Sequence, residues 1–283
     1  MEGQDLGAKA GWSGPDRPGP ARTSQSVRTE VTGQMLVITI DRPPANAIDV
    51  PTSRALYDAF DWLRCEPDLR AGIVTGAGQR FFCAGWDLKA AAAGESIESD
   101  HGPGGFAGLT EFFDLGKPVI AAVNGLAIGG GFELALAADL VVAAEHAEFA
   151  LTEVMLGLVA DAGGVLRLPA RLPLPIALEY LLTGHRLDAA QAHRWGLVNR
   201  VVPRADLMTA AFGLAEAICA AAPLAVAAVL EIVRKTAATD VQRGFEILRG
   251  GDLPAYRAML ASDDAREGPR AFGARRRPVW RGQ

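Results

Sequence analysis

The sequence of 283 residues has few side chains that bind metals or form cross-links, with three cysteines and four histidines. They are Cys65, Cys83, Cys219, His101, His146, His185 and His193. The cysteines are too scattered for a disulfide framework and lack the Cys-x-x-Cys spacing of zinc sites. The histidines also lack metal-ligand spacing, so we expect no metal site and place all four at the surface or at the edge of the core.

An excess of basic charge and a secretory leader are both missing. The formal net charge is -5 and the pI is about 5.5, which argues against a nucleic-acid-binding protein, since such proteins usually carry a basic face. The first residues hold no basic region followed by an apolar run, so a cytoplasmic protein is expected. The alanine-rich stretch 210–233 is interrupted by Glu216, Pro223 and Glu231, which predicts two packed helices and no membrane span.

Strand-like and helix-like segments alternate over much of the chain. Strands are expected at 35–40, 73–74, 119–123, 140–143 and 148–151, and helices from Pro51 and at 86–92 and 132–137. This alternation predicts an α/β fold in which a sheet is layered with helices. Beyond Leu187 the chain is expected to be helical, and residues 1–26, rich in Gly, Pro and Ser, are expected to be a disordered tail.

Three consecutive glycines, Gly129, Gly130 and Gly131, precede a helix that carries Glu133 in otherwise apolar sequence. Glycines allow close approach of a ligand, and the start of a helix presents unpaired N–H groups that favour negative charge. A carboxylate among apolar side chains is costly unless it has a partner or a function. From this segment alone, an active site and a tightly packed helix capped by Glu133 are both open.

A second glycine turn, with Gly76 and Gly78, follows the strand-like residues 71–74. It lacks the Gly-Lys-Ser/Thr ending of a phosphate loop, and Phe81 stands where a dinucleotide fingerprint needs its third glycine. Cys83 has no histidine, base or orienting acid near it in sequence, so it is predicted to be a buried core thiol.

These two turns and their flanking residues resemble the crotonase (enoyl-CoA hydratase/isomerase) superfamily. The matching segments are 44–48, 82–88, 117–125, 129–133, 149–153, 156–158 and 189–202, and the resemblance covers residues 27–283. It implies a ββα spiral core over residues 27–204 and a helical C-terminal trimerisation segment over residues 205–283. It also implies an acyl-CoA substrate and a homotrimer or a dimer of trimers.

The resemblance assigns catalytic roles to two glutamates. Glu133 would activate water, and Glu153, which follows a strand-like run, would handle the proton at Cα, with the roles exchanged in the reverse reaction. Taken alone, Glu153 would be interpreted as an N-cap or surface acid; the family resemblance favours the catalytic role. The backbone N–H groups of Trp86 and Gly130 would form the oxyanion hole, while the Trp86 side chain is expected to be a core aromatic.

Coenzyme A contacts are also implied by the resemblance. They involve Ala45, Ala47, Ala84, Asp87, Leu88, Phe272 and Arg275. Arg275 suits a phosphate, although the run 275–277 could equally be a solvated basic tail. No metal or redox cofactor is expected, since coenzyme A is part of the substrate.

Residues 84–92 and 101–111 resemble the carnitinyl-CoA dehydratase branch of the superfamily. A trimethylammonium group needs π faces or carboxylates, and six side chains are candidates for these roles. They are the aromatic Trp86, Phe106, Phe112 and Phe113 and the acidic Glu111 and Asp114. The aromatics could equally pack a lid.

The sequence therefore predicts an enzyme that adds water to a 2-enoyl-CoA or removes it. An enoyl-CoA isomerase would need one carboxylate, and a catalytically silent binding protein would need neither. The presence of both Glu133 and Glu153 favours the hydratase.

Overall fold

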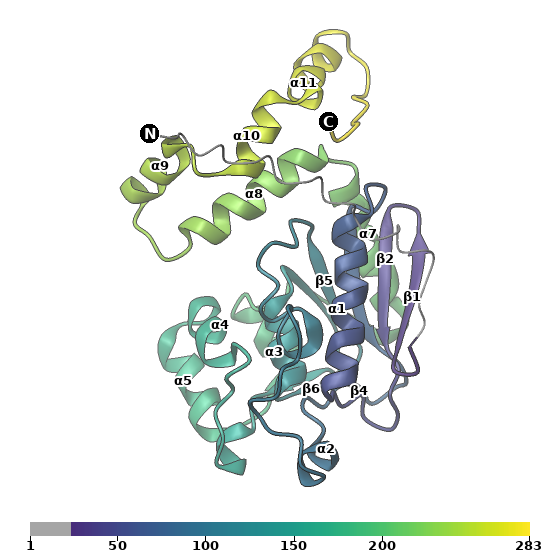
Figure 1. The fold of residues 1–283 in the computed structure, drawn as a ribbon, viewed down its shortest axis with the longest axis vertical. Helices are drawn as coiled ribbons and strands as arrows, with labels where there is room; N and C mark the ends of the chain where they lie inside the picture. The colour runs from purple at the N-terminus through teal and green to yellow at the C-terminus, as the bar shows by residue number, and fades with distance from the viewer. Residues whose placement is uncertain (1–23) are drawn as a thin grey trace, which may run out of the picture.

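The structure, a computed structural model, describes residues 24–283. The tail expected for residues 1–26 therefore falls almost entirely outside the described residues. From Val27 onward the chain forms two β-sheets with helices packed around them, followed by a projecting group of helices (Figure 1). The predicted α/β class is confirmed.

The larger sheet has six strands in the order β1-β2-β3-β5-β7-β10. They are β1 (Val27–Thr32), β2 (Met35–Ile40), β3 (Ala71–Gly76), β5 (Val119–Val123), β7 (Leu140–Ala144) and β10 (Arg200–Val202). β1 and β2 form an antiparallel pair, and every other neighbouring pair is parallel. β3 and β5 are buried throughout, as expected of apolar strands covered on both faces.

The smaller sheet has four short strands in the order β4-β6-β8-β9. They are β4 (Phe81–Cys83), β6 (Leu126–Ile128), β8 (Glu148–Ala150) and β9 (Leu187–Asp188). Along the chain, β3 is followed by β4, β5 by β6 and β7 by β8, so the backbone moves repeatedly from the large sheet to the small one. This repeated step is the ββα spiral that the resemblance implies.

Helices cover the sheets between these steps. They are α1 (Val50–Cys65), α2 (Leu88–Ala92), α3 (Gly130–Ala137), α4 (Gly164–Arg171), α5 (Leu174–Thr183) and α6 (Ala189–Arg194), with the single turns η1 (Phe106–Gly108), η2 (Glu153–Leu156) and η3 (Arg204–Asp206). Asp49 caps α1 by accepting a hydrogen bond from the Thr52 amide. The helix predicted from Trp86 begins two residues later, because Asp87 is its N-cap and accepts from the Lys89 amide.

The C-terminal part is less uniformly helical than predicted. β9 begins at Leu187 and β10 lies beyond it, where only helices were expected; both strands are too short to show a strand period in the sequence. α7 (Leu207–Cys219) packs on the large sheet through Leu207, Ala211 and Ala215, and with it forms a second apolar cluster.

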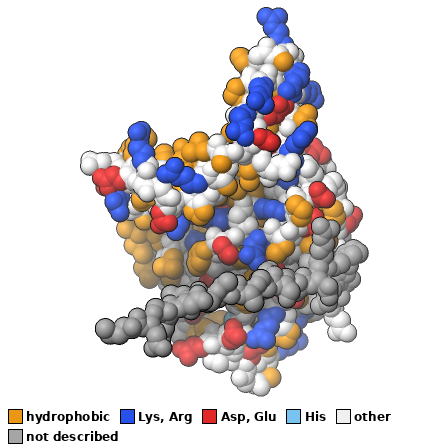
Figure 2. Space-filling view, turned by 45° about the horizontal axis from the view of Figure 1, so that its top comes forward, with side chains coloured by type: hydrophobic (Ala, Val, Ile, Leu, Met, Phe, Trp, Pro, Cys, Tyr) orange, Lys and Arg blue, Asp and Glu red, His pale blue; other side chains and the backbone are white. Residues whose placement is uncertain are grey.

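α8 (Pro223–Thr236), α9 (Val241–Gly250), α10 (Pro254–Ala261) and α11 (Asp263–Gly273) form a lobe that projects from the body (Figure 1). Arg70 ties its base to the body by donating to the carbonyl oxygens of Cys219 and Trp280. Hydrophobic side chains gather where this C-terminal lobe meets the body (Figure 2). Among the described helices, none is by itself long and apolar enough to cross a membrane; α7 and α8 pass that test only as a pair, across a bend of 102°.

Candidate active site

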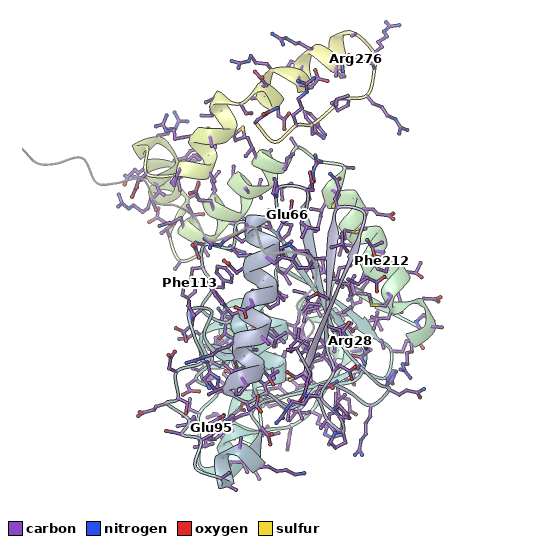
Figure 3. The ribbon with its side chains drawn as sticks, turned by 45° about the vertical axis from the view of Figure 1, so that its right-hand side comes forward. Arg28, Glu66, Glu95, Phe113, Phe212 and Arg276 are labelled. Carbon is purple, nitrogen blue, oxygen red and sulfur yellow. The ribbon has the colours of Figure 1, made fainter. Side chains whose placement is uncertain are left out.

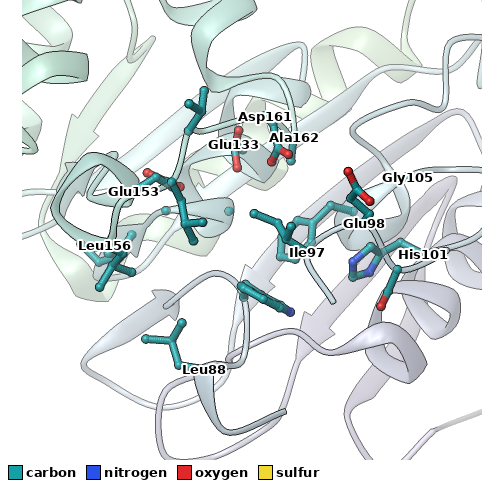
Figure 4. Close-up of a pocket in the computed structure, with 18 of the residues that line it drawn as sticks. Leu88, Ile97, Glu98, His101, Gly105, Glu133, Glu153, Leu156, Asp161 and Ala162 are labelled. Carbon is teal, nitrogen blue, oxygen red and sulfur yellow. The ribbon is translucent and has the colours of Figure 1, made fainter. Parts of the chain in front are cut away.

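A cavity of about 490 Å³ opens between the small sheet and the start of α3 (Figure 4). Four segments form its walls: the turn after β4, the loop 97–111, η2, and the residues that precede α4. Both predicted catalytic glutamates line it, as do Trp86 and Gly130. The two glycine-rich turns of the sequence therefore meet at one cavity.

The start of α3 lies against the turn that leads to Trp86. Gly85 has a φ of 80°, and a Cβ built on it would lie 2.7 Å from the Gly130 nitrogen and 2.7 Å from the Ile128 carbonyl oxygen. Only glycine fits that contact. Neither the Trp86 amide nor the Gly130 amide donates to another described residue, and Gly130 is the first residue of its helix. Two unpaired N–H groups are thus held side by side at the cavity.

Glu133 is buried, with 3% of its surface exposed. Its Oε1 accepts a hydrogen bond of 2.7 Å from the Gly164 amide, at the start of α4. A Cβ on Gly164 would lie 3.0 Å from that oxygen, so the glycine permits the contact. The pKa of Glu133 is raised to about 8, chiefly by burial; the charges of Glu153 and Asp161 add to this shift, and the Gly164 amide opposes it.

Glu153 is the first residue of η2 and reaches the start of α3. A Cβ built on Gly129 would lie 3.1 Å from its Oε1, while its Oε2 is buried without a hydrogen-bond partner among the described residues. Burial, followed by the charge of Asp161, raises the pKa of Glu153 as well. Two carboxyl groups with raised pKa values in one cavity favour a state in which they hold one proton between them.

The Trp86 side chain packs against the main core, as expected, but it is only partly buried and also lines the cavity. Its indole donates from Nε1 to Oε1 of Glu95 at 2.7 Å. The other oxygen of Glu95 accepts from the Val50 amide at the start of α1. The indole is therefore fixed in the cavity wall, through a partner that lies nine residues away in a loop.

Five of the predicted coenzyme A contacts lie close together. They are Ala45, Ala47, Ala84, Asp87 and Leu88. The Ala84 amide donates to the Ala45 carbonyl oxygen, and Arg42 binds both the Ala47 carbonyl oxygen and the Asp87 carboxylate. Ala84 and the exposed Leu88 line the cavity.

One buried amide holds this region together. Asn46 has a φ of 54°, and its Nδ2 lies 2.9 Å, 3.1 Å and 3.2 Å from the carbonyl oxygens of Ala77, Phe81 and Phe82. The loop between β2 and α1 is thereby attached to β4, the strand that leads to Trp86.

Phe272 and Arg275 do not lie at the cavity of their own chain. Both belong to the C-terminal lobe, and neither is among the residues that line the cavity. In Figure 1, α11 lies at the opposite end of the molecule from α2, which borders the cavity. The Phe272 side chain is 88% exposed, which is unusual for a large apolar residue.

The loop 97–111 brings only part of the expected cation-binding set to the cavity. Phe106 and Glu111 line the cavity. The prediction was wrong for Phe112, which is buried against Tyr57, and for Asp114, which pairs with Arg64. The prediction was also wrong for Phe113, which lines the groove between α8 and the body. Figure 3 shows Phe113 well away from Glu95, the partner of the Trp86 indole.

Two charged or titratable cavity residues had no predicted role at the site. Asp161 was given no role, and His101 was expected at the surface or the core edge, yet both line the cavity. Cys83 is buried as predicted, and burial raises the pKa of its thiol to about 12. Among residues 24–283, no cluster of three or more metal-binding side chains is present.

Known proteins are similar to this chain over most of its length. The enoyl-CoA hydratase/isomerase family model matches residues 30–283. A carnitinyl-CoA dehydratase from Proteus mirabilis is 55% identical over 92% of this chain and 100% of its own. Among solved structures, an enoyl-CoA hydratase from Mycobacterium tuberculosis has a TM-score of 0.83, and a carnitinyl-CoA hydratase from Mycobacterium avium one of 0.72. Both are 44% identical, and both alignments cover 92% of this chain and 100% of the other.

The fold and the comparisons define the class of protein as a hydro-lyase acting on acyl-CoA thioesters. The chain belongs to the enoyl-CoA hydratase/isomerase, or crotonase, family.

Proposed function

We propose that the chain interconverts a 2-enoyl-CoA and the corresponding 3-hydroxyacyl-CoA, with crotonobetainyl-CoA and carnitinyl-CoA as the preferred pair. The observation that carries this proposal is the meeting of Glu133 and Glu153 at the start of α3, beside the unpaired amides of Trp86 and Gly130. Each chemical requirement of the reaction has a group in this arrangement.

Removal of water begins with ionised Glu153, which takes the proton from Cα. Electrons then shift toward the thioester carbonyl, whose oxygen accepts hydrogen bonds from the Trp86 and Gly130 amides. Protonated Glu133 donates its proton to the hydroxyl at Cβ as the carbon–oxygen bond breaks and water leaves. The larger upward pKa shift at Glu133 puts the shared proton on the residue that needs it for this direction.

Addition of water is the same path in reverse. Glu133, now ionised, takes a proton from water as its oxygen attacks Cβ, and Glu153 delivers its proton to Cα. The reaction is redox-neutral, so we propose that it uses no metal or redox cofactor and that coenzyme A enters only as part of the substrate.

The proposed acyl group carries a permanent positive charge, and the cavity is rich in acidic side chains. Six carboxyl groups line it: Glu98, Asp100, Glu111, Glu133, Glu153 and Asp161. Phe106 and Trp86 add aromatic faces, and cation–π contacts contribute about 0.5 to 2 kcal/mol each. Relatives that are 55–56% identical over their whole length bear the name carnitinyl-CoA dehydratase.

The coenzyme A moiety would contact backbone around Ala45, Ala47, Ala84, Asp87 and Leu88. Phe272 and Arg275 would complete that site from a neighbouring copy, in a cytoplasmic homotrimer or dimer of trimers. The exposed Phe272 and the apolar groove between α8 and the body support such an assembly, since large apolar surfaces of this kind are usually covered by a partner.

The test compares kcat/KM for crotonobetainyl-CoA and for crotonyl-CoA, which lacks the cation. A ratio well above one is expected, together with incorporation of solvent oxygen into the product. A ratio below one would make this a general short-chain hydratase. Movement of the double bond without water incorporation would make it an isomerase, and no turnover of either thioester would leave a binding protein.

A further inference from the structure

His101 lies in the cavity wall, across the cavity from Glu153 and Leu156 (Figure 4). The reaction steps described above do not use it. Its Nδ1 lies 2.9 Å from Oγ of Ser53, a fully buried residue of α1. The same Oγ accepts a hydrogen bond of 3.1 Å from the Ala107 amide.

These two contacts hold the imidazole in place in both of its protonation states. The Ser53 oxygen accepts from the Ala107 amide, and its hydroxyl can either donate to His101 Nδ1 or accept from it. When Nδ1 accepts, the imidazole is neutral and its hydrogen is on Nε2. When the ring is protonated, both ring nitrogens donate and the hydroxyl turns to accept.

The imidazole also stands in a charged neighbourhood. The carboxyl groups of Glu95, Asp100 and Asp161 act on it, and Glu98 and Glu111 line the same cavity. Arg54 of α1 is the cation on this side, and it pairs with Asp100. Burial lowers the pKa of His101 below its usual 6.5, against the opposite effect of Glu95 and Asp100.

The ring of Phe106 packs edge-on against His101, with centroids 5.2 Å apart and planes at 67°. Two nearly perpendicular aromatic rings form a corner in the cavity wall, and a corner of π faces beside carboxylates suits a quaternary ammonium group. We propose that His101 is a specificity-determining residue: its neutral imidazole admits a trimethylammonium tail, and its protonated form repels that tail. This inference rests on the substrate proposed above.

The expected pH dependence follows from the charge of the ring. Above its pKa the imidazole is neutral and adds a π face, whereas below that pKa it places a positive charge next to a cationic substrate. The protonated imidazole does not repel a neutral substrate of the same shape. The ratio of the two specificities therefore cancels the acid–base role of Glu133 and Glu153, which is the same for both substrates. Their attraction for the cation remains in the ratio and is common to the wild type and to a histidine variant.

The experiment measures kcat/KM for crotonobetainyl-CoA and for its neutral isostere, in which a tert-butyl group replaces the trimethylammonium group. The ratio of cation to isostere is followed from about pH 8 down to about pH 5.5, a range that spans histidine titration. In the wild-type protein the ratio is expected to fall about tenfold, the effect of one added charge at contact distance. A flat wild-type ratio above one would overturn the proposal for His101.

The matched variant is His101→Asn, whose amide oxygen can still accept from Ser53 and which does not titrate. Its ratio is expected to lose most of the pH dependence, leaving only the part that comes from the neighbouring carboxyl groups. His146→Asn, at an exposed histidine outside the cavity, should keep the full wild-type dependence. If His101→Asn also kept it, the carboxyl groups alone would be the cause and His101 would have no such role.

The two proposals fail differently. A wild-type ratio near or below one at every pH would remove the cationic substrate itself, and the role of His101 with it. A high ratio that does not depend on His101 would remove only the present inference.

Discussion

The ring of Phe106 lies directly over the α-carbon of Gly130, so that a Cβ on Gly130 would stand 2.4 Å from Cε1 of Phe106. This contact joins the loop 97–111 to the first residue of α3, whose amide is the proposed oxyanion donor. Glycine at position 130 thus serves the packing of the loop as well as the approach of substrate.

Gly130→Ala is expected to lower kcat/KM for crotonyl-CoA at least tenfold, because the added methyl group must displace either the Phe106 ring or the Gly130 amide. Complete loss of an oxyanion donor costs about 2.7 to 4 kcal/mol of transition-state stabilisation. Adding Phe106→Ala should restore part of the loss by opening space. Gly213→Ala is the control, since a Cβ there meets nothing within 4 Å. A double variant as slow as the single one would show that the ring is not the obstacle.

Glu133→Gln and Glu153→Gln are each expected to lower the rates of hydration and dehydration by at least about 10²-fold, the usual effect of losing general acid or base help. The amide has the shape of the acid but cannot exchange the proton. Glu179→Gln, at an exposed position outside the cavity, should leave the rates unchanged. Circular dichroism would verify that each variant is folded. Near wild-type turnover by either active-site variant would disprove the two-carboxylate assignment.

Glu133→Gln is also expected to stabilise the fold at neutral and alkaline pH. The pKa of Glu133 is about 8 in the folded protein and 4.5 for an ordinary glutamate, so the folded state binds more protons between these pH values. Its contribution to stability is therefore present below pH 4.5 and is lost as pH rises to about 8. At pH 8 the variant should gain on the order of a few kcal/mol.

Urea unfolding at several pH values measures this gain. Gln keeps an oxygen that can accept from the Gly164 amide, so the comparison isolates the ionisable proton. The stability difference between variant and wild type should shrink toward zero as pH falls to about 4.5. A difference that does not change with pH would mean that Glu133 ionises normally.

Deleting the residues after Arg266 is expected to impair both assembly and substrate binding, because it removes Phe272 and Arg275 together with the Arg281 and Gly282 amides that bind the Asp264 carboxylate. Light scattering and KM for the CoA thioester are the two readouts. Phe272→Ala in the full-length chain should raise KM while leaving the oligomer intact. A monodisperse and fully active monomer would refute the proposed trimer.

The parts of the site that could be predicted from sequence lie in short, local patterns. This holds for the glycines before α3, for Glu133 and for Glu153 after β8. Each of them lies in or next to the helix or strand that positions it, so a local sequence motif is enough to predict where it lies. His101 could not be found this way, because its partner Ser53 is 48 residues away and meets it only when the loop folds onto α1.

The errors have a common physical cause. Phe106 and Phe113 belong to one segment, yet the irregular backbone around η1, where Ala107 has a φ of 55°, turns them to different surfaces. No helical or strand period predicts such a path. The three-residue strands β4 and β6 were likewise not predicted, because they are defined by pairing with each other rather than by their own composition.

The contacts of the Asn46 amide have a consequence for how tightly a ligand can bind. Its Nδ2 joins two stretches of chain that hold proposed coenzyme A contacts and that a ligand bound there would otherwise have to bring into order itself. The loss of conformational entropy has thus already occurred during folding, and more of the contact free energy of the ligand remains available as affinity. A shift at this distant amide would be transmitted to the turn before Trp86, where a misplacement of about 1 Å is enough to slow a reaction by about 10²-fold.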